Sequence, residues 1–297
     1  MQESSKKNSL ITNVTPPFDS SKTAKPVLAI KTATKEPSFW LKIGRGSRTT
    51  PLTKGDYAKI FLTDDTIQKV YERKDLDKIL AGAIRERWIN KLYQKCIKED
   101  DYKQIIILGS GFDIKPFKKN SLNQFGKTNA SLYSTVRFWE IDRAVILDEK
   151  ERIFKENNLD KNASYIKADY VKDDIIEMLH NEGVNFSAPT LIIWEGNWMY
   201  LENEEVDKTF KTLKDSFDHF IITFDYCSQS LVDNTNTVRP LWQGHKLGID
   251  DICHFAEQHG LTVVANQTTD NLAKEYDVDN SPPEEFSQYS VCSLQKC

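Results

Sequence analysis

The sequence predicts a mainly parallel, doubly wound α/β fold, and three observations support that prediction. Between residues 104 and 294, short apolar segments alternate with stretches of helical periodicity. Several of these segments are continuous apolar runs, which is typical of strands that are buried on both faces. The first run is bounded by glycine, as expected where a strand turns into a helix. Strands and helices that alternate in this way favour a parallel sheet with helices on both sides.

Seven strands and at least four intervening helices are expected in this region. The strands are expected over residues 104–108, 136–141, 165–167, 191–194, 219–224, 261–265 and 289–294. The helices are expected over residues 143–156, 173–181, 203–216 and 249–259. Gly260 follows the last of these helices, at a position where glycine commonly ends a helix.

The remaining segments predict one domain with two additions. Residues 1–37 are rich in Ser, Lys, Thr and Pro and are expected to form a flexible arm. Residues 38–297 are expected to form the domain, with a helical cap over 38–100. Residues 228–248 interrupt the regular pattern, and we expect them to cover the site as a lid.

Composition argues against several classes of protein. The formal net charge of -4 disfavours a general nucleic-acid binder, which needs a basic surface. The five cysteines are scattered and form no CxxC pair, so we expect neither a disulfide framework nor a metal site. Reduced thiols, no signal peptide and no apolar run of about 18 residues predict a cytoplasmic protein without a membrane span.

A glycine-containing turn follows the first strand, in the sequence LGSGFD at residues 108–113. Glycine lets the backbone approach a ligand closely, and ligands of such sheets bind beyond the carboxyl ends of the strands. An ordinary tight turn would look the same. A dinucleotide-binding motif fits poorly, because its third glycine is replaced by Ile114 and its expected acidic residue lies too far along, at Asp142.

The second strand ends in FWEID, which places two acidic residues near the same edge of the sheet. A carboxylate at this point can accept hydrogen bonds from both hydroxyls of a ribose. Strand alternation puts Glu140 and Asp142 on one face. An alternative interpretation is that Asp142 merely caps the helix that follows.

Four motifs occur in order along the chain: LGSGFD, FWEID, KADY and IIWEGNWMYL. Together they resemble the leucine carboxyl methyltransferase family and its bacterial small-molecule O-methyltransferase relatives, over roughly residues 83–294. The segment EGNWMYL at residues 195–201 is the most diagnostic of them. The resemblance implies a class I methyltransferase fold, with an antiparallel last strand, that binds S-adenosylmethionine.

The resemblance also implies which residues hold the cofactor. Gly109 and Gly111 would line its methionine end with Glu195 nearby, Asp142 would bind the ribose, and Asp169 and Tyr170 would flank the adenine. Arg85 or Arg87 would bind the methionine carboxylate, with spacing favouring Arg85; the alternative is a solvated helix face. The full expected set is Arg85, Arg87, Gly109, Ser110, Gly111, Asp113, Glu140, Asp142, Asp169, Tyr170, Glu195 and Gly196.

The chain departs from the family pattern at three places. Tyr170 stands where leucine is usual, and Lys115-Pro116 replaces threonine and arginine. Asn197 is polar where the family has an apolar residue. These departures leave the methyl acceptor open.

The expected reaction is methylation of a carboxylate, on a protein C-terminus or on a small molecule. A carboxylate is already ionised at neutral pH and needs no general base. Arg239 is the expected anchor for this acceptor, and Tyr200 could donate a hydrogen bond to it; otherwise Arg239 is a loop cation and Tyr200 a packing residue. Two alternatives stay open: a cofactor-binding regulatory protein without transfer activity, and a nucleotide-binding oxidoreductase. The sequence does not predict the oligomeric state.

Overall fold

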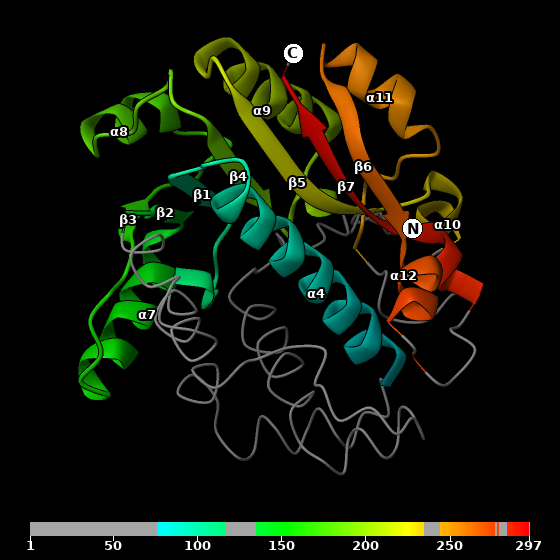
Figure 1. Cartoon of the computed structure of the whole chain (residues 1–297), viewed down its shortest axis with the longest axis horizontal. Helices are drawn as coiled ribbons and strands as arrows, with labels where there is room; N and C mark the ends of the chain where they lie inside the picture. The colour runs from blue at the N-terminus through cyan, green and yellow to red at the C-terminus, as the bar shows by residue number, and fades with distance from the viewer. Residues whose placement is uncertain (1–75, 117–134, 235–243, 277, 279–283, 297) are drawn as a thin grey trace, which may run out of the picture.

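A seven-stranded sheet forms the centre of the computed structural model, which describes residues 76–116, 135–234, 244–276, 278 and 284–296. The strands lie in the order β3-β2-β1-β4-β5-β7-β6 (Figure 1). The predicted arm at 1–37 and the first part of the predicted cap, 38–75, fall outside the described residues, so this division of the chain stays a prediction.

The strands agree with the predicted fold class. Five of them, β1 to β5, pair in parallel, and β7 is antiparallel to both of its neighbours. This mixed sheet confirms the class I methyltransferase fold. The strands are β1 Gln104–Leu108, β2 Arg137–Asp142, β3 Ser164–Lys167, β4 Thr190–Trp194, β5 Phe220–Cys227, β6 Thr262–Thr268 and β7 Tyr289–Gln295.

Helices connect the strands and cover the sheet. The α-helices are α4 Leu76–Lys98, α7 Ala144–Glu156, α8 Ile175–Asn181, α9 Asn203–Ser216, α10 Gln229–Asp233, α11 Ile252–Gln258 and α12 Thr269–Glu275, and the short 3₁₀ helices are η3 Trp198–Tyr200 and η5 Glu284–Gln288. Aspartates begin two of them: Asp174 accepts two backbone N–H bonds at the start of α8, and Asp251 does so at α11. Such caps satisfy donors that the first helical turn leaves without partners.

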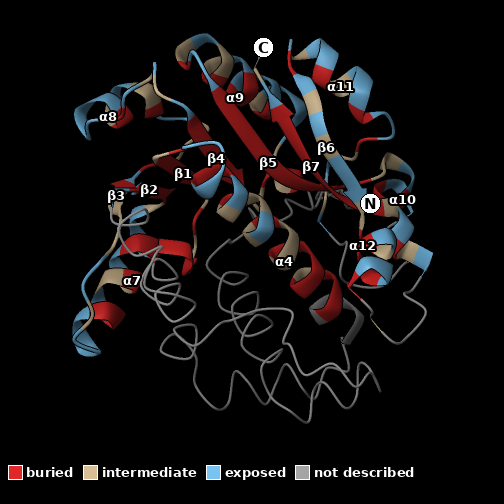
Figure 2. Ribbon diagram, in the orientation of Figure 1, coloured by how far each residue is buried: buried red, intermediate tan, exposed pale blue. Residues whose placement is uncertain are grey.

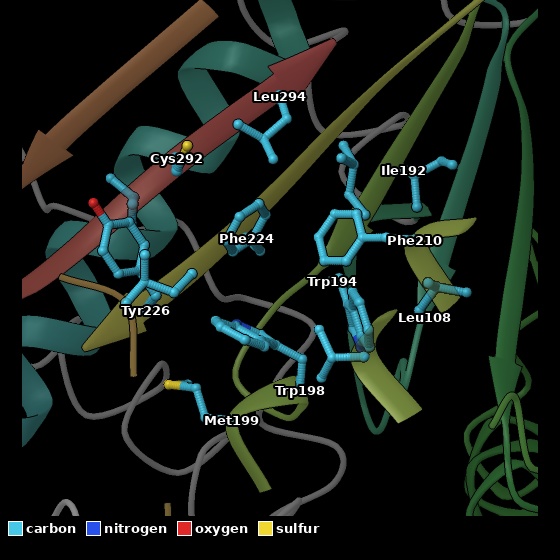
Figure 3. Packing of buried hydrophobic residues seen from close by; sticks show 14 of the residues in the cluster. Leu108, Ile192, Trp194, Trp198, Met199, Phe210, Phe224, Tyr226, Cys292 and Leu294 are labelled. Carbon is cyan, nitrogen blue, oxygen red and sulfur yellow. The ribbon is translucent and has the colours of Figure 1, made fainter. Parts of the chain in front are cut away.

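The central strands β1, β4 and β5 are buried on both faces, as their apolar runs predict, whereas the edge strand β6 is largely exposed (Figure 2). Along β1, Ile105 and Ile107 belong to a cluster that includes residues from the second half of α4. Ile106 and Leu108 belong to the larger cluster on the opposite face. Aromatic rings from β4, η3, α9 and β5 pack together in this larger cluster, namely Trp194, Trp198, Phe210 and Phe224 (Figure 3).

No helix in the described ranges combines the length and the apolar content that a membrane span needs. Two features of the fold position the site. The fifth strand extends three residues beyond the predicted end at 224, and these residues include Asp225. The long helix α4 crosses in front of the sheet and brings Arg85 to the strands (Figure 1).

Candidate functional site

The carboxyl ends of β1, β2 and β4 lie at one edge of the sheet, because these strands are parallel. The strand order turns back at β1, with β2 and β3 on one side of it and β4 and β5 on the other. Ligands of open α/β sheets bind outside the carboxyl ends of the strands at such a switch point. The residues that follow these three strands are therefore the first candidates for a binding site.

The glycine turn after β1 is tied to the end of β2. Gly109 and Gly111 have φ angles of 60° and 52°, in the left-handed region that favours glycine. The Gly111 N–H donates to the Asp142 carboxylate at 2.7 Å, and the Ser110 N–H donates to the carbonyl of Ile141 at 3.1 Å. The other oxygen of Asp142 accepts the N–H of Arg143 at 2.7 Å. Asp142 thus holds the turn in place.

The alternative role of Asp142 as a helix cap does not match this geometry. A capping side chain accepts an N–H from the second or third residue of the helix, and α7 has no such side-chain bond at its start. Burial raises the pKa of Asp142, while the N–H bonds from Gly111 and Arg143 lower it.

Glu140 faces a different partner from Asp142. It is buried and forms an ion pair with the buried ammonium of Lys150 on α7. Burial raises the pKa of Glu140 to about 7, although Lys150 opposes the shift. Of the two acidic residues predicted on one face, only Asp142 contacts the turn. Glu140 Oε1 and Ser110 Oγ are buried and find no hydrogen-bond partner within the described ranges.

Arg85 on α4 meets residues from three strands or strand ends. Its guanidinium lies 3.0 Å from Glu195 Oε1 after β4 and 2.8 Å from Asp225 Oδ2 on β5. It also donates to the Tyr289 hydroxyl on β7 at 2.7 Å. Burial alone would lower the pKa of Arg85, but the nearby Asp225, Tyr289 and Glu195 raise it well above its usual value.

Lys115, a departure from the family pattern, extends this group. Its ammonium lies 2.6 Å from Asp113 and 2.8 Å from the second oxygen of Glu195, and the side chain is 1% exposed. Burial would lower the pKa of Lys115, but the two carboxylates raise it above its usual value. We call Arg85, Lys115, Asp113, Glu195 and Asp225 the ion-pair cluster.

Gly196 lies directly against the ion-pair cluster. Its N–H donates to the Asp225 carboxylate at 2.7 Å, and its φ is 74°. A Cβ at this position would lie 3.3 Å from the guanidinium nitrogens of Arg85. Arg85 is therefore not on a solvated helix face.

The other candidate arginine, Arg87, lies elsewhere. Its guanidinium carbon stacks 4.4 Å from the centre of the Tyr276 ring on α12. Two residues along a helix point in different directions, so α4 can bring only one of the pair to the cluster. The structure brings Arg85 together with Glu195 and Asp113, and it does not bring Arg87 there.

The two residues expected near adenine lie just after β3. Asp169 accepts the N–H of Val171 at 3.2 Å and pairs with Lys172 at 3.2 Å. The hydroxyl of Tyr170 accepts the indole N–H of Trp194 at 3.2 Å, which joins the β3 end to the β4 end.

Tyr200, the described member of the expected acceptor site, packs against His245. The two rings meet edge to face with centroids 4.9 Å apart, and His245 Nδ1 lies 3.6 Å from the buried thiol of Cys227. Burial lowers the pKa of His245 to about 4 and raises the pKa of Tyr200 to about 12, so both side chains are neutral at pH 7. Arg239, the other expected acceptor residue, lies outside the described residues.

Residues 244–248, at the end of the predicted lid, lie against η3. The N–H of Lys246 donates to the carbonyl of Met199 at 2.8 Å, and Gly244 lies beside the Tyr200 ring. Residues 235–243 of the predicted lid are not described, so the lid itself stays a prediction.

Sequence reasoning missed several members of this site. The sequence indicates no role for Asp225, Tyr289 or Lys150; it marks His245 only as part of the predicted lid and Lys115 only as a departure. A signal for Asp225 exists, because it is a charged residue within an otherwise apolar run, FIITFDYC, that forms a buried strand. Charges are rarely buried without a partner. No comparable signal marks Tyr289.

Comparison with known proteins gives one family match and several matches of fold. The model of the leucine carboxyl methyltransferase family matches residues 44–214, more than half of the chain. No curated protein sequence matches this chain.

Two solved structures show the same fold at low sequence identity. A protein from Thermobifida fusca YX, provisionally assigned as a methyltransferase, is 14% identical with a TM-score of 0.55, over 95% of this chain and 98% of that one. A DUF574 family protein from Streptomyces avermitilis MA-4680 is 12% identical with a TM-score of 0.54, over 90% and 100%.

Proposed function

Because the chain belongs to the leucine carboxyl methyltransferase family, and is therefore an S-adenosylmethionine-dependent methyltransferase, we propose that it methylates a carboxylate. The acceptor is the C-terminus of a protein or a small carboxylic acid. The ion-pair cluster beside the glycine turn is the observation that carries the assignment of the cofactor-binding site.

The charge of the ion-pair cluster suits this cofactor. Three carboxylates, those of Asp113, Glu195 and Asp225, face the two cations Arg85 and Lys115. The five residues thus bring charges of both signs to a place that little solvent reaches. S-adenosylmethionine carries a sulfonium and an ammonium against a single carboxylate. A ligand with charges of both signs would find partners among these groups, and buried charge is costly unless it is paired.

The backbone and unpaired polar atoms also suit the cofactor. Arg85, Gly109, Ser110, Gly111, Asp113, Glu195 and Gly196 would hold its methionine end, Asp142 and Glu140 its ribose, and Asp169 and Tyr170 its adenine. Each Asp142 oxygen accepts one N–H bond and keeps lone pairs for ribose hydroxyls. Ser110 Oγ, which has no hydrogen-bond partner among the described residues, would supply a further polar contact in the turn.

The bound cofactor supplies an electrophilic methyl group, and the protein must place the acceptor in line with it. A carboxylate acceptor loses no proton, so its placement is the main requirement. We assign this role to Arg239 as the anchor and to Tyr200 as a hydrogen-bond donor. The Tyr200 hydroxyl is protonated at neutral pH, as a donor must be, and burial raises its pKa further, to about 12.

The test is methyl transfer from S-adenosylmethionine labelled in its methyl group, with a cell lysate and a panel of carboxylic acids as acceptors. A methyl ester releases its label as volatile methanol in mild base, whereas methyl ethers and amines keep it. We expect a base-labile product, formed by the natural chain and lost in Asp142→Ala. Asp148→Ala, which removes an exposed partner of Lys167, is the matched control and keeps activity.

Two outcomes contradict the proposal in different ways. A base-stable labelled product would show another acceptor group. Binding of S-adenosylhomocysteine without any labelled product would favour the regulatory alternative.

A cytoplasmic location is part of the proposal, since the four described cysteines are free thiols, as is usual in a reducing compartment.

A further inference from the structure

Two departures from the family pattern, Tyr170 and Asn197, form a hydrogen bond with each other. The Tyr170 hydroxyl lies 3.0 Å from Asn197 Oδ1 and also accepts the indole N–H of Trp194 at 3.2 Å. The Tyr170 and Trp194 rings meet edge to face with centroids 5.8 Å apart. Burial raises the pKa of Tyr170, so its hydroxyl stays protonated and donates to Asn197.

The other end of the Asn197 amide binds the first strand. Its nitrogen donates to the carbonyls of Leu108 at 3.1 Å and Gly109 at 2.9 Å. These two acceptors fix the amide orientation, because only the nitrogen can donate to carbonyls. The side chain fills the space beside Gly109, where a Cβ would lie 1.9 Å from the amide nitrogen.

These contacts form a polar chain across three strand ends. It runs from Trp194 at the end of β4, through Tyr170 after β3 and Asn197 after β4, to the glycine turn after β1. Each donor named along it has an acceptor. Buried chains of this kind hold their members in one arrangement, and the loss of one member leaves the others without partners.

We propose that Tyr170 and Asn197 act as a single positioning pair for the cofactor. Through the hydrogen bond between them, they set the glycine turn at the methionine side relative to the tyrosine ring at the adenine side. The inference rests on the proposed binding site and goes beyond it, because it assigns a shared role to two positions at which the family pattern has apolar residues.

The pair predicts non-additive effects on binding. Tyr170→Phe removes only the hydroxyl and leaves the Asn197 oxygen without this donor. Asn197→Leu leaves the Tyr170 hydroxyl without this acceptor and frees the turn. We expect each variant to weaken S-adenosylhomocysteine binding about tenfold, and the double variant to be no more than about threefold weaker than the worse single variant.

The chain offers a matched control in a second tyrosine–asparagine pair. The Tyr226 hydroxyl donates to Asn266 Oδ1, also at 3.0 Å, between β5 and β6. Tyr226→Phe and Asn266→Leu remove the same kind of bond away from the glycine turn. We expect these variants to change the free energy of unfolding while S-adenosylhomocysteine affinity stays within about twofold of the natural chain.

The experiment is titration calorimetry with S-adenosylhomocysteine for both cycles, at a temperature where circular dichroism shows every variant folded. The indole N–H resonance of Trp194 is followed by NMR in the same titrations. We expect it to shift with ligand in the natural chain and in Tyr226→Phe, and to shift much less in Tyr170→Phe. A purely structural bond would leave this response unchanged.

The outcomes separate the two proposals. If the natural chain does not bind S-adenosylhomocysteine, the proposed binding site is wrong. If it binds but the losses multiply to about a hundredfold in the double variant, or the single variants bind normally, the positioning pair is wrong.

Discussion

Arg85 on α4 and Asp225 on β5 are 140 positions apart in the sequence, yet a guanidinium nitrogen of one lies 2.8 Å from a carboxylate oxygen of the other. Their side chains are 10% and 0% exposed. A buried ion pair contributes little net stability when intact, but removal of one partner leaves a buried charge uncompensated. The pair therefore makes the candidate site and the stability of the fold depend on the same residues.

Arg85→Ala is expected to lower the free energy of unfolding by about 3–5 kcal/mol, because the buried Asp225 loses its cation and Glu195 loses one of its two cations. S-adenosylhomocysteine affinity should fall at least tenfold in chain that remains folded. Arg87→Ala should cost about 0.5–1 kcal/mol through the lost contact with Tyr276 and leave the affinity unchanged. Urea unfolding and calorimetry measure both quantities. Equal losses of affinity in the two variants would show that the assignment to Arg85 is wrong.

Gly109→Ala and Gly183→Ala separate backbone strain from crowding. Both glycines have positive φ, 60° and 75°, so alanine should cost about 1–2 kcal/mol of stability at either position. At Gly183 the new methyl group meets, among the described residues, only the end of Arg137, at 3.5 Å, whereas at Gly109 it collides with the Asn197 amide. Of the two variants, we expect only Gly109→Ala to weaken S-adenosylhomocysteine binding, by about tenfold. Normal binding by this variant would contradict the close packing of Asn197 on the turn.

Lys150→Met is expected to destabilise the chain more at high pH than at low pH. The pKa of Glu140 is about 7, above its ordinary value because of burial, so the folded chain binds this proton more tightly than the unfolded chain. The stability that the folded chain gains from protonated Glu140 is thus fully present below the ordinary pKa of a glutamate, and it decreases as pH rises through 7. Loss of Lys150 raises this pKa further. We expect a loss of about 3 kcal/mol at pH 8.5 and little at pH 5.

A nearby exposed lysine is the control for this prediction. Lys161 lies 5.3 Å from the same Tyr165 ring that Lys150 approaches, but its side chain is 51% exposed. Lys161→Met should change stability little and equally at both pH values, because solvent screens its interactions. A Lys150→Met effect that does not vary with pH would mean that Glu140 titrates in its usual range.

The buried strands were predictable because a strand that is buried on both faces is a continuous run of apolar residues. The run 104–108 is apolar throughout and forms β1 with the same bounds. The helix α12 was not predicted, because it begins directly where β6 ends, at Thr268, with no glycine or proline between the two elements. The strand β5 was predicted to end at 224 because Asp225 reads as a terminus. In fact the strand continues, since Arg85 and Tyr289 satisfy the carboxylate.

The candidate site was predictable as far as local motifs reach. The turn at Gly109 and Gly111 and the acidic residue Asp142 follow from their positions at strand ends, and the structure joins them. The partners of Arg85 could not be derived, because they come from β5 and β7 and depend on the order of strands in the sheet. Lys115 was visible as an unusual residue, but only the fold shows that its ammonium reaches Glu195.

The last strand has a consequence for how the protein is made. Tyr289 on β7 bonds both Arg85 and Asp225, so an element early in the described chain is completed by one near its end. The ribosome must therefore translate β7 before Arg85 can form its hydrogen bond with Tyr289. A chain that stalls earlier would carry unpaired charges in a half-built interior, which is a state that chaperones and proteases recognise.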